Sequence, residues 1–230
     1  MHIDIQTRGA FGSALVKLEP SDSFVSESGA MFRASSNIDI DVTTRPRGST
    51  GGLLAGVKRL LGGENFFFST YRSRDGMPGE VGLAPTLGGE VRVVELDGSK
   101  SWVCAGGSYM GSHPNVNLDI QFQGLRGLFS GESMFFMQAS GSGPLLVNAY
   151  GEITEVEVDG ELVVDTGHVV AFEETLSYSL TKTGGSWLTS FLSGEGVVFR
   201  FSGHGKLLVQ SHNPAEFGKH LGRLLPPRKG

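Results

Sequence analysis

The sequence predicts an all-β protein built from three repeated units, and three observations lead to this prediction. A short motif ending in Gly-Glu occurs at Glu64, Glu132 and Glu195, so it returns after 68 and then 63 residues. An aromatic or β-branched run follows each copy, as expected for a strand. The chain also contains 35 Gly but only 9 Pro, which indicates many tight turns rather than a disordered segment. A repeat of this kind indicates units of one architecture.

A second signature marks the start of each unit. An apolar strand runs into a glycine and a second apolar pair leaves it, at 24–32, 103–110 and 163–170. Each unit should therefore contain a strand, a Gly turn, a second strand, an apolar connector to Gly-Glu, and returning strands. We expect residues 1–96 to contain N-terminal strands followed by the first unit, which starts near residue 20. The second unit should span 97–158 and the third 159–214, with a C-terminal helix and tail at 215–230.

The N-terminal part carries the most additions. Apolar alternation at 3–5 and an apolar run at 14–18 predict two strands ahead of the first unit. Residues 45–52, rich in Gly and Arg, are expected to form a loop. Residues 53–61 could form about two turns of helix, and 72–79 form a turn-rich insertion.

A returning strand is expected to close each unit, at 89–94, 144–149 and 206–211. Asp-Gly pairs at 97–98 and 159–160 then predict the hairpin turns that open the next units. Residues 139–143, Ala-Ser-Gly-Ser-Gly, are expected to form a hairpin loop between strands. The chain ends with helical spacing at 214–225, followed by a Pro-Pro stop.

Composition narrows the classes of function. The net charge is −5 with both signs scattered, which argues against nucleic-acid binding through clustered Lys and Arg. Cys104 is the single cysteine, so no intrachain disulfide can form, and its apolar neighbours predict a buried structural thiol. The N-terminus lacks the features of a signal peptide, and no apolar run approaches the ~20 residues of a membrane span. These features predict a cytoplasmic protein.

The repeated carboxylates form the sharpest candidate site. If the three units surround a pseudo-threefold axis, Glu64, Glu132 and Glu195 become equivalent and could converge on a cation. The alternative is that each carboxylate accepts backbone N–H groups at a tight turn. The structural role is favoured, because repeated geometry alone says little about function.

The connectors ahead of these carboxylates are unusually apolar. Leu54 in the first unit corresponds to Leu128 in the second and to Trp187 and Phe191 in the third. If these side chains share one face, they form a patch for a protein partner, a membrane surface or a second copy of the chain. If they do not, they cap the core between sheets, and the sequence leaves both alternatives open.

No catalytic or metal constellation emerges. The histidines, at 113, 168, 204, 212 and 220 among others, lack the His-x-His plus Glu pattern of metal-bearing double-stranded β-helix enzymes. Neither a nucleophile elbow nor a phosphate-binding Gly-Lys-Ser/Thr loop occurs. The sequence predicts no catalytic residue, no metal ligand and no cofactor.

Four motifs together resemble a known family. They are Val-x-x-x-Gly-x-Met at 25–31, Gly-Leu-x-x-Gly-x-x-Arg at 52–59, the Gly-Glu-x-x-Phe-Phe step at 131–136, and the run Asp-Gly-Glu-Leu-Val-Val-Asp-Thr-Gly-His at 159–168. They are similar to the family named for altered inheritance of mitochondria, whose bacterial members are mostly conserved proteins of unknown function. The resemblance covers about residues 5–215, and the last motif is its most specific part.

The resemblance implies a fold similar to the tryptophan RNA-binding attenuator protein, with three shortened double-stranded β-helix modules in one chain. It supplies no catalytic residues, and RNA binding does not follow from the name of a fold. The favoured function is a non-catalytic binding or scaffolding protein that forms a homo-oligomer and uses an apolar face, with a protein partner or a peripheral membrane contact as further expectations. The alternative is a small-ligand or metal-ion binding protein, or an unrecognised enzyme, with its pocket in a module or at the pseudo-threefold centre.

Overall fold

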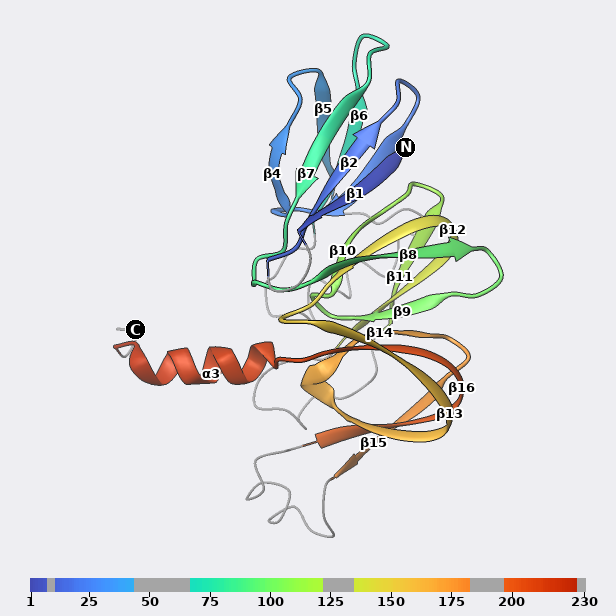
Figure 1. Ribbon diagram of the computed structural model, residues 1–230, viewed down its shortest axis with the longest axis vertical. Helices are drawn as coiled ribbons and strands as arrows, with labels where there is room; N and C mark the ends of the chain where they lie inside the picture. Colours follow the sequence, from blue (N-terminus) through green and yellow to red (C-terminus); the bar gives the residue numbers. More distant parts are fainter. Residues whose placement is uncertain (8–10, 44–66, 122–134, 183–196, 227–230) are drawn as a thin grey trace.

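The chain folds into antiparallel β-sheets followed by one short C-terminal helix, as a computed structural model of 230 residues shows. The structure describes residues 1–7, 11–43, 67–121, 135–182 and 197–226. The strands lie in three tiers along the long axis of the molecule, and the helix projects from the lowest tier (Figure 1). The expected loop at 45–52 and helix at 53–61 lie outside the described residues.

Sixteen strands and two helical segments are described. The first tier contains β1 (His2–Thr7), β2 (Ser13–Leu18), β3 (Ser23–Glu27), β4 (Met31–Ala34), β5 (Ile38–Thr43), β6 (Phe68–Ser73) and β7 (Gly79–Leu83). The second contains β8 (Val91–Asp97), β9 (Trp102–Ala105), β10 (Tyr109–Ser112), β11 (Val116–Gln121) and β12 (Phe136–Asn148). The third contains β13 (Ile153–Asp165), the 3-10 turn η1 (Thr166–His168), β14 (Val169–Glu173), β15 (Ser177–Lys182), β16 (Val197–Gln210) and the helix α3 (Pro214–Leu224).

One pattern of strand pairing occurs in each tier. In the first tier β6 pairs with β3 and β5, while β7 pairs with β2 and β4. In the second, the single long strand β12 pairs with β9 and β11 through its first half and with β8 and β10 through its second half. In the third, β16 pairs with β13, β14 and β15. The module boundaries and the pseudo-threefold arrangement stay predictions.

Hydrogen-bonded strands also connect the tiers. β10 pairs with β3, placing Gly111 opposite Ser26, and β14 pairs with β9, placing Ala171 opposite Cys104. These two contacts join strands of all three tiers into one 12-stranded sheet, beside a separate 4-stranded sheet of β1, β2, β7 and β4. Of residues 89–94, which the sequence assigns to the end of the first unit, those from Val91 onward form the start of β8, which pairs with β12 of the second tier.

The hairpins expected at three glycine-containing sites are absent among the described strands. At Asp97-Gly98 the chain bends, with Gly98 at φ +85°, but the flanking strands β8 and β9 both pair with β12 and not with each other, so no hairpin forms. The prediction for 159–160 was wrong, since Gly160 lies within the unbroken strand β13 at φ +104° and opposite Gly203 of β16. The hairpin loop expected at 139–143 was also wrong. Gly141 and Gly143 lie inside β12, where positive φ angles change the strand direction without breaking its pairing.

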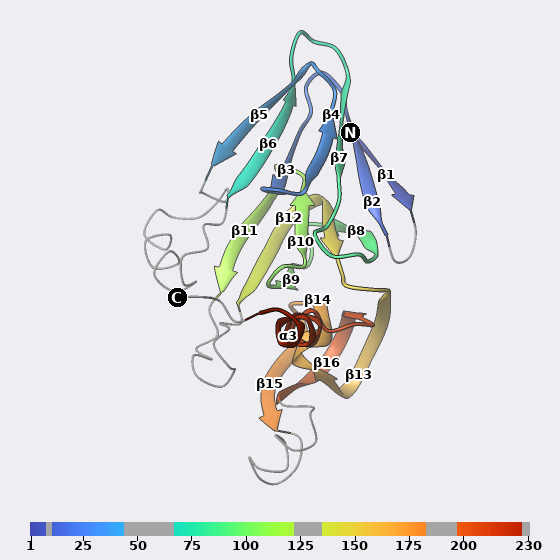
Figure 2. The same cartoon turned by 90° about the vertical axis from the view of Figure 1, so that its left-hand side faces the viewer.

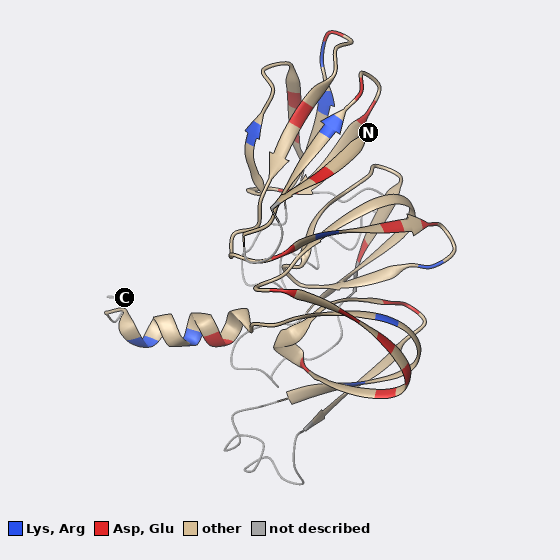
Figure 3. Cartoon of the chain, viewed as in Figure 1, with Lys and Arg blue, Asp and Glu red and all other residues tan. Residues whose placement is uncertain are grey.

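The hydrophobic core has three parts, one associated with each tier. Each part includes side chains from a neighbouring tier, as when Met110 and Leu146 join the first-tier core and Val103 and Phe136 join that of the third. Cys104 is fully buried in the second-tier core, as expected, and burial raises the pKa of its thiol to about 12. Acidic and basic side chains are spread over all three tiers (Figure 3).

A backbone junction ties the three tiers together at Gly89. The Gly12 N–H donates to the Gly89 carbonyl at 2.7 Å, and Gly89 forms a parallel bridge with Gly151 at the link between β12 and β13. The Glu90 carboxylate continues this junction by accepting from the Ile153 N–H at 2.7 Å. The approach is so close that a Cβ on Gly12 or Gly89 would lie within 3 Å of neighbouring backbone atoms.

The C-terminal helix matches the prediction for 214–225 within one residue. Asn213 caps α3, and Pro214 occupies its first turn. No residue of α3 is buried, and the axis of the helix points away from the strands (Figures 1 and 2). In the part of the chain that the structure describes, no helix is long and apolar enough to cross a membrane.

Candidate functional site

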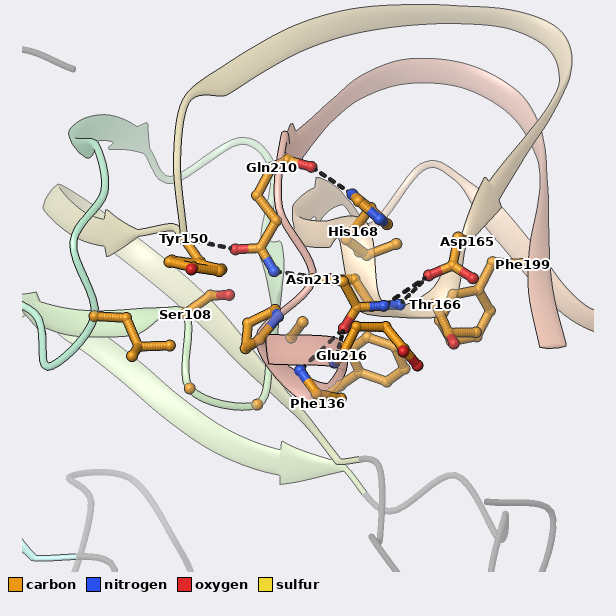
Figure 4. Close-up of a pocket in the computed structure, with 18 of the residues that line it drawn as sticks. Ser108, Phe136, Tyr150, Asp165, Thr166, His168, Phe199, Gln210, Asn213 and Glu216 are labelled. Atoms are coloured by element: carbon orange, nitrogen blue, oxygen red, sulfur yellow. Dashed lines mark hydrogen bonds between the residues drawn. The ribbon is translucent and has the colours of Figure 1, made fainter. Parts of the chain in front are cut away.

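A cavity of about 1290 Å³ lies where the second and third tiers meet the start of α3 (Figure 4). The turn between β9 and β10 forms one wall, and η1, the ends of β16 and the first turns of α3 form the others. Aromatic and aliphatic side chains, including Phe135, Phe136, Val163 and Phe199, line its apolar part. Its volume exceeds the ~300–1,000 Å³ typical of small-molecule sites.

Gln210, at the end of β16, organises the polar wall. Its side-chain Oε1 accepts from the Tyr150 N–H at 2.8 Å, and its Nε2 donates to the Gly167 carbonyl at 2.8 Å. The Gln210 side chain is only 8% exposed, and these bonds compensate for the water that it loses on burial. The side-chain amide of Gln210 thereby joins the link between β12 and β13 to η1 through two hydrogen bonds.

His168 is oriented by the backbone of the same residue. Its Nδ1 lies 2.8 Å from the Gln210 carbonyl oxygen. A carbonyl can only accept a hydrogen bond, so Nδ1 carries the proton when the imidazole is neutral, and Nε2 then has a lone pair. His168 lines the cavity, so Nε2 is its available acceptor for a ligand.

Asp165 and Asn213 fix α3 to η1. The Asp165 carboxylate accepts from the Gly167 N–H at 2.9 Å and from the Asn213 amide at 3.3 Å. The Asn213 Oδ1 in turn accepts from the N–H groups of Ala215 and Glu216, at 3.0 and 3.3 Å. A Cβ on Gly167 would overlap the Asn213 amide, so the close approach of η1 to the helix cap requires glycine.

Asn213→Ala is expected to loosen α3, because it removes both the helix cap and the bond to Asp165. Loss of an N-cap destabilises a helix by about 1 kcal/mol. Amide hydrogen exchange in 214–224 should therefore accelerate severalfold, while the strands retain their protection. Asn213→Ser is the matched control, since it keeps an oxygen at the cap and should recover most of the protection. Equal exchange in the Ala variant and the wild type would contradict this role.

Two further polar side chains, Glu27 and Ser108, also line the cavity. Glu27, at the end of β3, has a carboxyl group whose pKa burial raises to about 7. No ion pair joins it to a described Lys, Arg or His, unlike the salt-bridged Glu90 or Glu173. Ser108, in the turn before β10, is 6% exposed, and no hydrogen bond joins its hydroxyl to another described residue. The cavity therefore contains polar groups for which the described residues provide no partner.

The site residues predicted from the sequence all lie outside the described residues. This holds for the three carboxylates and for the four apolar connector side chains: Glu64, Glu132, Glu195, Leu54, Leu128, Trp187 and Phe191. Convergence of the carboxylates and a shared apolar loop face stay predictions.

The histidines are dispersed. His113 accepts from the Asn115 N–H, His204 lies 2.7 Å from Asp159 on the surface, and His212 contacts the Ser211 hydroxyl. Among the residues that the structure describes, no group of three or more His, Cys, Asp or Glu side chains could hold a metal ion.

Sequence reasoning missed Gln210, Asn213, Glu27 and Ser108. A glutamine directly after the apolar run 207–209 was a usable signal, because a polar residue in a buried strand needs partners. The run at 159–168 was recognised as specific, and its last four residues do lie on the cavity wall.

Comparison with known proteins identifies a family model and individual proteins that are similar to this chain. The family model described as mitochondrial biogenesis AIM24 matches residues 3–212. An uncharacterized protein of Streptococcus pyogenes serotype M6 is 30% identical over 231 aligned residues, covering 98% of this chain and 92% of the relative. The crystal structure of a Streptococcus pyogenes protein from a structural genomics consortium has a TM-score of 0.79 at 28% identity, covering 97% of this chain and 99% of that one.

Proposed function

This chain belongs to the AIM24 family, and we propose that it is a non-catalytic binding and scaffolding protein that associates with a second copy of itself through α3. One observation carries the proposal: the helix projects from the strands (Figure 1), and the exposed fractions of its apolar side chains are high, reaching 70% at Leu224. A solvated apolar stripe on a projecting helix is typical of a surface that binds a partner.

The stripe has helical spacing. Phe217, Leu221 and Leu224 are separated by four and three residues, so they lie on one face of α3. Phe217 packs against Tyr150 with ring centroids 5.3 Å apart, while Leu224 is 70% exposed. Burying each leucine contributes about 1.5–3 kcal/mol, which favours association.

The distribution of charge supports a second copy as the partner. Glu216 lies in the first turn of α3 and Arg223 in the last. In an antiparallel pair of identical helices, each Glu216 lies opposite the Arg223 of the other copy, and both helix dipoles are also compensated. Gly218 and Gly222 have open space where a Cβ would be, which lets a second helix approach closely.

We also propose that the three tiers are shortened double-stranded β-helix modules related by a pseudo-threefold arrangement. The repeated strand pairing supports this, because each tier uses equivalent partners in the same order along the chain. In such an arrangement α3 extends the third module and is a separate element for assembly.

Leu221→Asp combined with Leu224→Asp is expected to weaken self-association roughly tenfold or more, because two leucines that the proposed dimer would bury become charged. Sedimentation velocity over a range of protein concentrations measures the change. Circular dichroism should show that the strands remain folded, since neither side chain contacts the core.

Val42→Asp is the matched control, since Val42 is an exposed apolar residue on β5 in the first tier. It should leave the association constant unchanged. Leu54→Asp with Trp187→Asp tests the alternative loop face predicted from the sequence. A wild type that stays monomeric, or a dimer that tolerates the α3 variant, would overturn the proposal. Flotation with liposomes that is lost in the α3 variant would instead identify a membrane as the partner.

A further inference from the structure

The cavity has features that self-association through α3 does not use. Its apolar wall includes Phe136 and Phe199, whose ring centroids lie 5.8 Å apart, together with Phe135 and Val163. The lining also includes polar groups without partners among the described residues. Such a combination of apolar surface with a few oriented polar groups is typical of a ligand site.

Ser108 is one of these groups. Its backbone is used by the fold, because the Ser108 carbonyl accepts from the Asn148 side chain at 3.2 Å and its N–H donates to Ala105. No described residue bonds to its hydroxyl, although Ser108 is almost completely buried, and the hydroxyl points into the cavity (Figure 4). A buried hydroxyl without a partner destabilises the fold, and a ligand would relieve that cost.

Glu27 is the second group, and the described residues of the strands that pack against β3 supply no compensating charge. β3 packs between β6 and β10. On β6 the only charged side chain is Arg72, which pairs with Asp41 and lies opposite Ser23 at the other end of β3. β10 carries no charged residue, and its Tyr109 is the titratable group nearby, with a pKa that desolvation and the Glu27 carboxylate both raise.

The charged residues that line the cavity favour a ligand with a positive charge. Glu27, Asp165 and Glu216 line the cavity, whereas Lys219 is its single described Lys or Arg and is bonded to Glu216 at 2.7 Å. An anionic ligand would therefore meet carboxylates, while a cation would find a partner in Glu27. The Nε2 lone pair of His168 adds a further acceptor for N–H or O–H groups.

We propose that this cavity binds a cationic amphiphile, an amine whose ammonium group pairs with the Glu27 carboxylate and hydrogen bonds to Ser108, and whose apolar body lies along Phe135 and Val163. The amine could be a free molecule or the headgroup of a membrane lipid, since both present the same chemistry. The large volume of the cavity suits a ligand with a long chain.

Isothermal titration calorimetry on the full chain tests the proposal, with decylammonium, decanoate and decanol as probes below their micellar concentrations. Decylammonium should bind at least tenfold more tightly than decanoate. Glu27→Gln should reduce the affinity for decylammonium at least tenfold and leave that for decanol unchanged. Glu216→Gln is the matched control on the same wall, and it should preserve the preference for the amine.

Proton release gives an independent signature. The Glu27 carboxyl has a pKa of about 7, so at pH 7 it is about half protonated, and pairing with an ammonium group favours the ionised form. Titrations in buffers with different heats of ionisation should therefore detect release of about half a proton in the wild type and none in Glu27→Gln.

Three outcomes would overturn the inference: no heat with decylammonium, equal affinity for decanoate, or an unchanged amine affinity in Glu27→Gln. Flotation with phosphatidylethanolamine vesicles, compared with phosphatidylcholine alone, distinguishes a lipid headgroup from a free amine. The Leu221→Asp, Leu224→Asp variant should bind decylammonium normally, which separates this cavity from the dimer contact.

Discussion

Replacing Gly89 with alanine is expected to prevent the chain from folding stably, with a loss of about 4 kcal/mol or more. A Cβ at this position would overlap the Ala149 carbonyl oxygen and lie 2.7 Å from its carbon and 2.8 Å from the Gly151 nitrogen. All three are backbone atoms, so no side chain can rotate away. Urea unfolding followed by tryptophan fluorescence measures the loss, and low soluble yield is its extreme form.

The reason for so large an effect is the position of Gly89 at the junction of the tiers. Moving its backbone would also displace the Gly12–Gly89 hydrogen bond and the bridge to Gly151. Gly218→Ala is the matched control, because a Cβ there meets nothing within 4 Å and alanine favours a helix by about 1 kcal/mol over glycine. If Gly89→Ala unfolds at the same urea concentration as the wild type, the junction does not hold the tiers together.

Glu27→Gln is expected to stabilise the protein in a strongly pH-dependent way. The Glu27 carboxyl has a pKa of 4.5 when exposed and about 7 when folded, since burial disfavours its charged form. Between these values the folded state binds more protons than the unfolded state, so the free energy of unfolding falls as pH rises. Above pH 7 the ionised carboxylate destabilises the fold by about 3 kcal/mol.

Glutamine removes this penalty without changing the shape of the side chain. The variant should unfold like the wild type at pH 4 and have a Tm about 5–10 °C higher at pH 8. Thermal melts across this range measure the difference, with Glu95→Gln at an exposed position of β8 as the control that follows the wild-type curve. A gain independent of pH, or a gain largest in acid, would show that the carboxyl is not the cause.

The strands were predictable where local pattern and tertiary structure agree. Alternation at 3–5 and the apolar run at 14–18 became β1 and β2, and the helical spacing after Asn213 became α3. The two Asp-Gly pairs show the limit. Gly98 directly follows β8 and Gly160 lies within β13, although their local chemistry is the same. The partner strand continues in both cases, since β12 pairs with β8 and then with β9. The difference is that the residues from Asp97 to Trp102 outnumber those facing them on β12, so the chain leaves the sheet there.

The candidate site was less predictable because its members are distant in sequence. Asp165 and His168 belong to a run that resemblance marks as specific, but their partners Asn213 and Gln210 lie more than 40 residues later. Nothing in the sequence distinguishes Glu27 from other glutamates in strands, because the pKa of its carboxyl group rises only when folding buries it. Burial, and the lack of a counter-charge among the residues that the structure describes, depend on how the tiers assemble, and no local pattern encodes them.

The pairing of β3 with β10 and of β9 with β14 has a consequence for fragments of this chain. A piece containing one tier would expose the backbone N–H and C=O groups that now pair with the next tier. Such an unprotected edge is a template for another chain, so fragments should aggregate or exchange strands with each other. Cleavage between the tiers is therefore expected to produce fragments that associate through their exposed strand edges. In the same way, a homologue that gains or loses one tier needs another segment of chain to pair with the edge that this exposes.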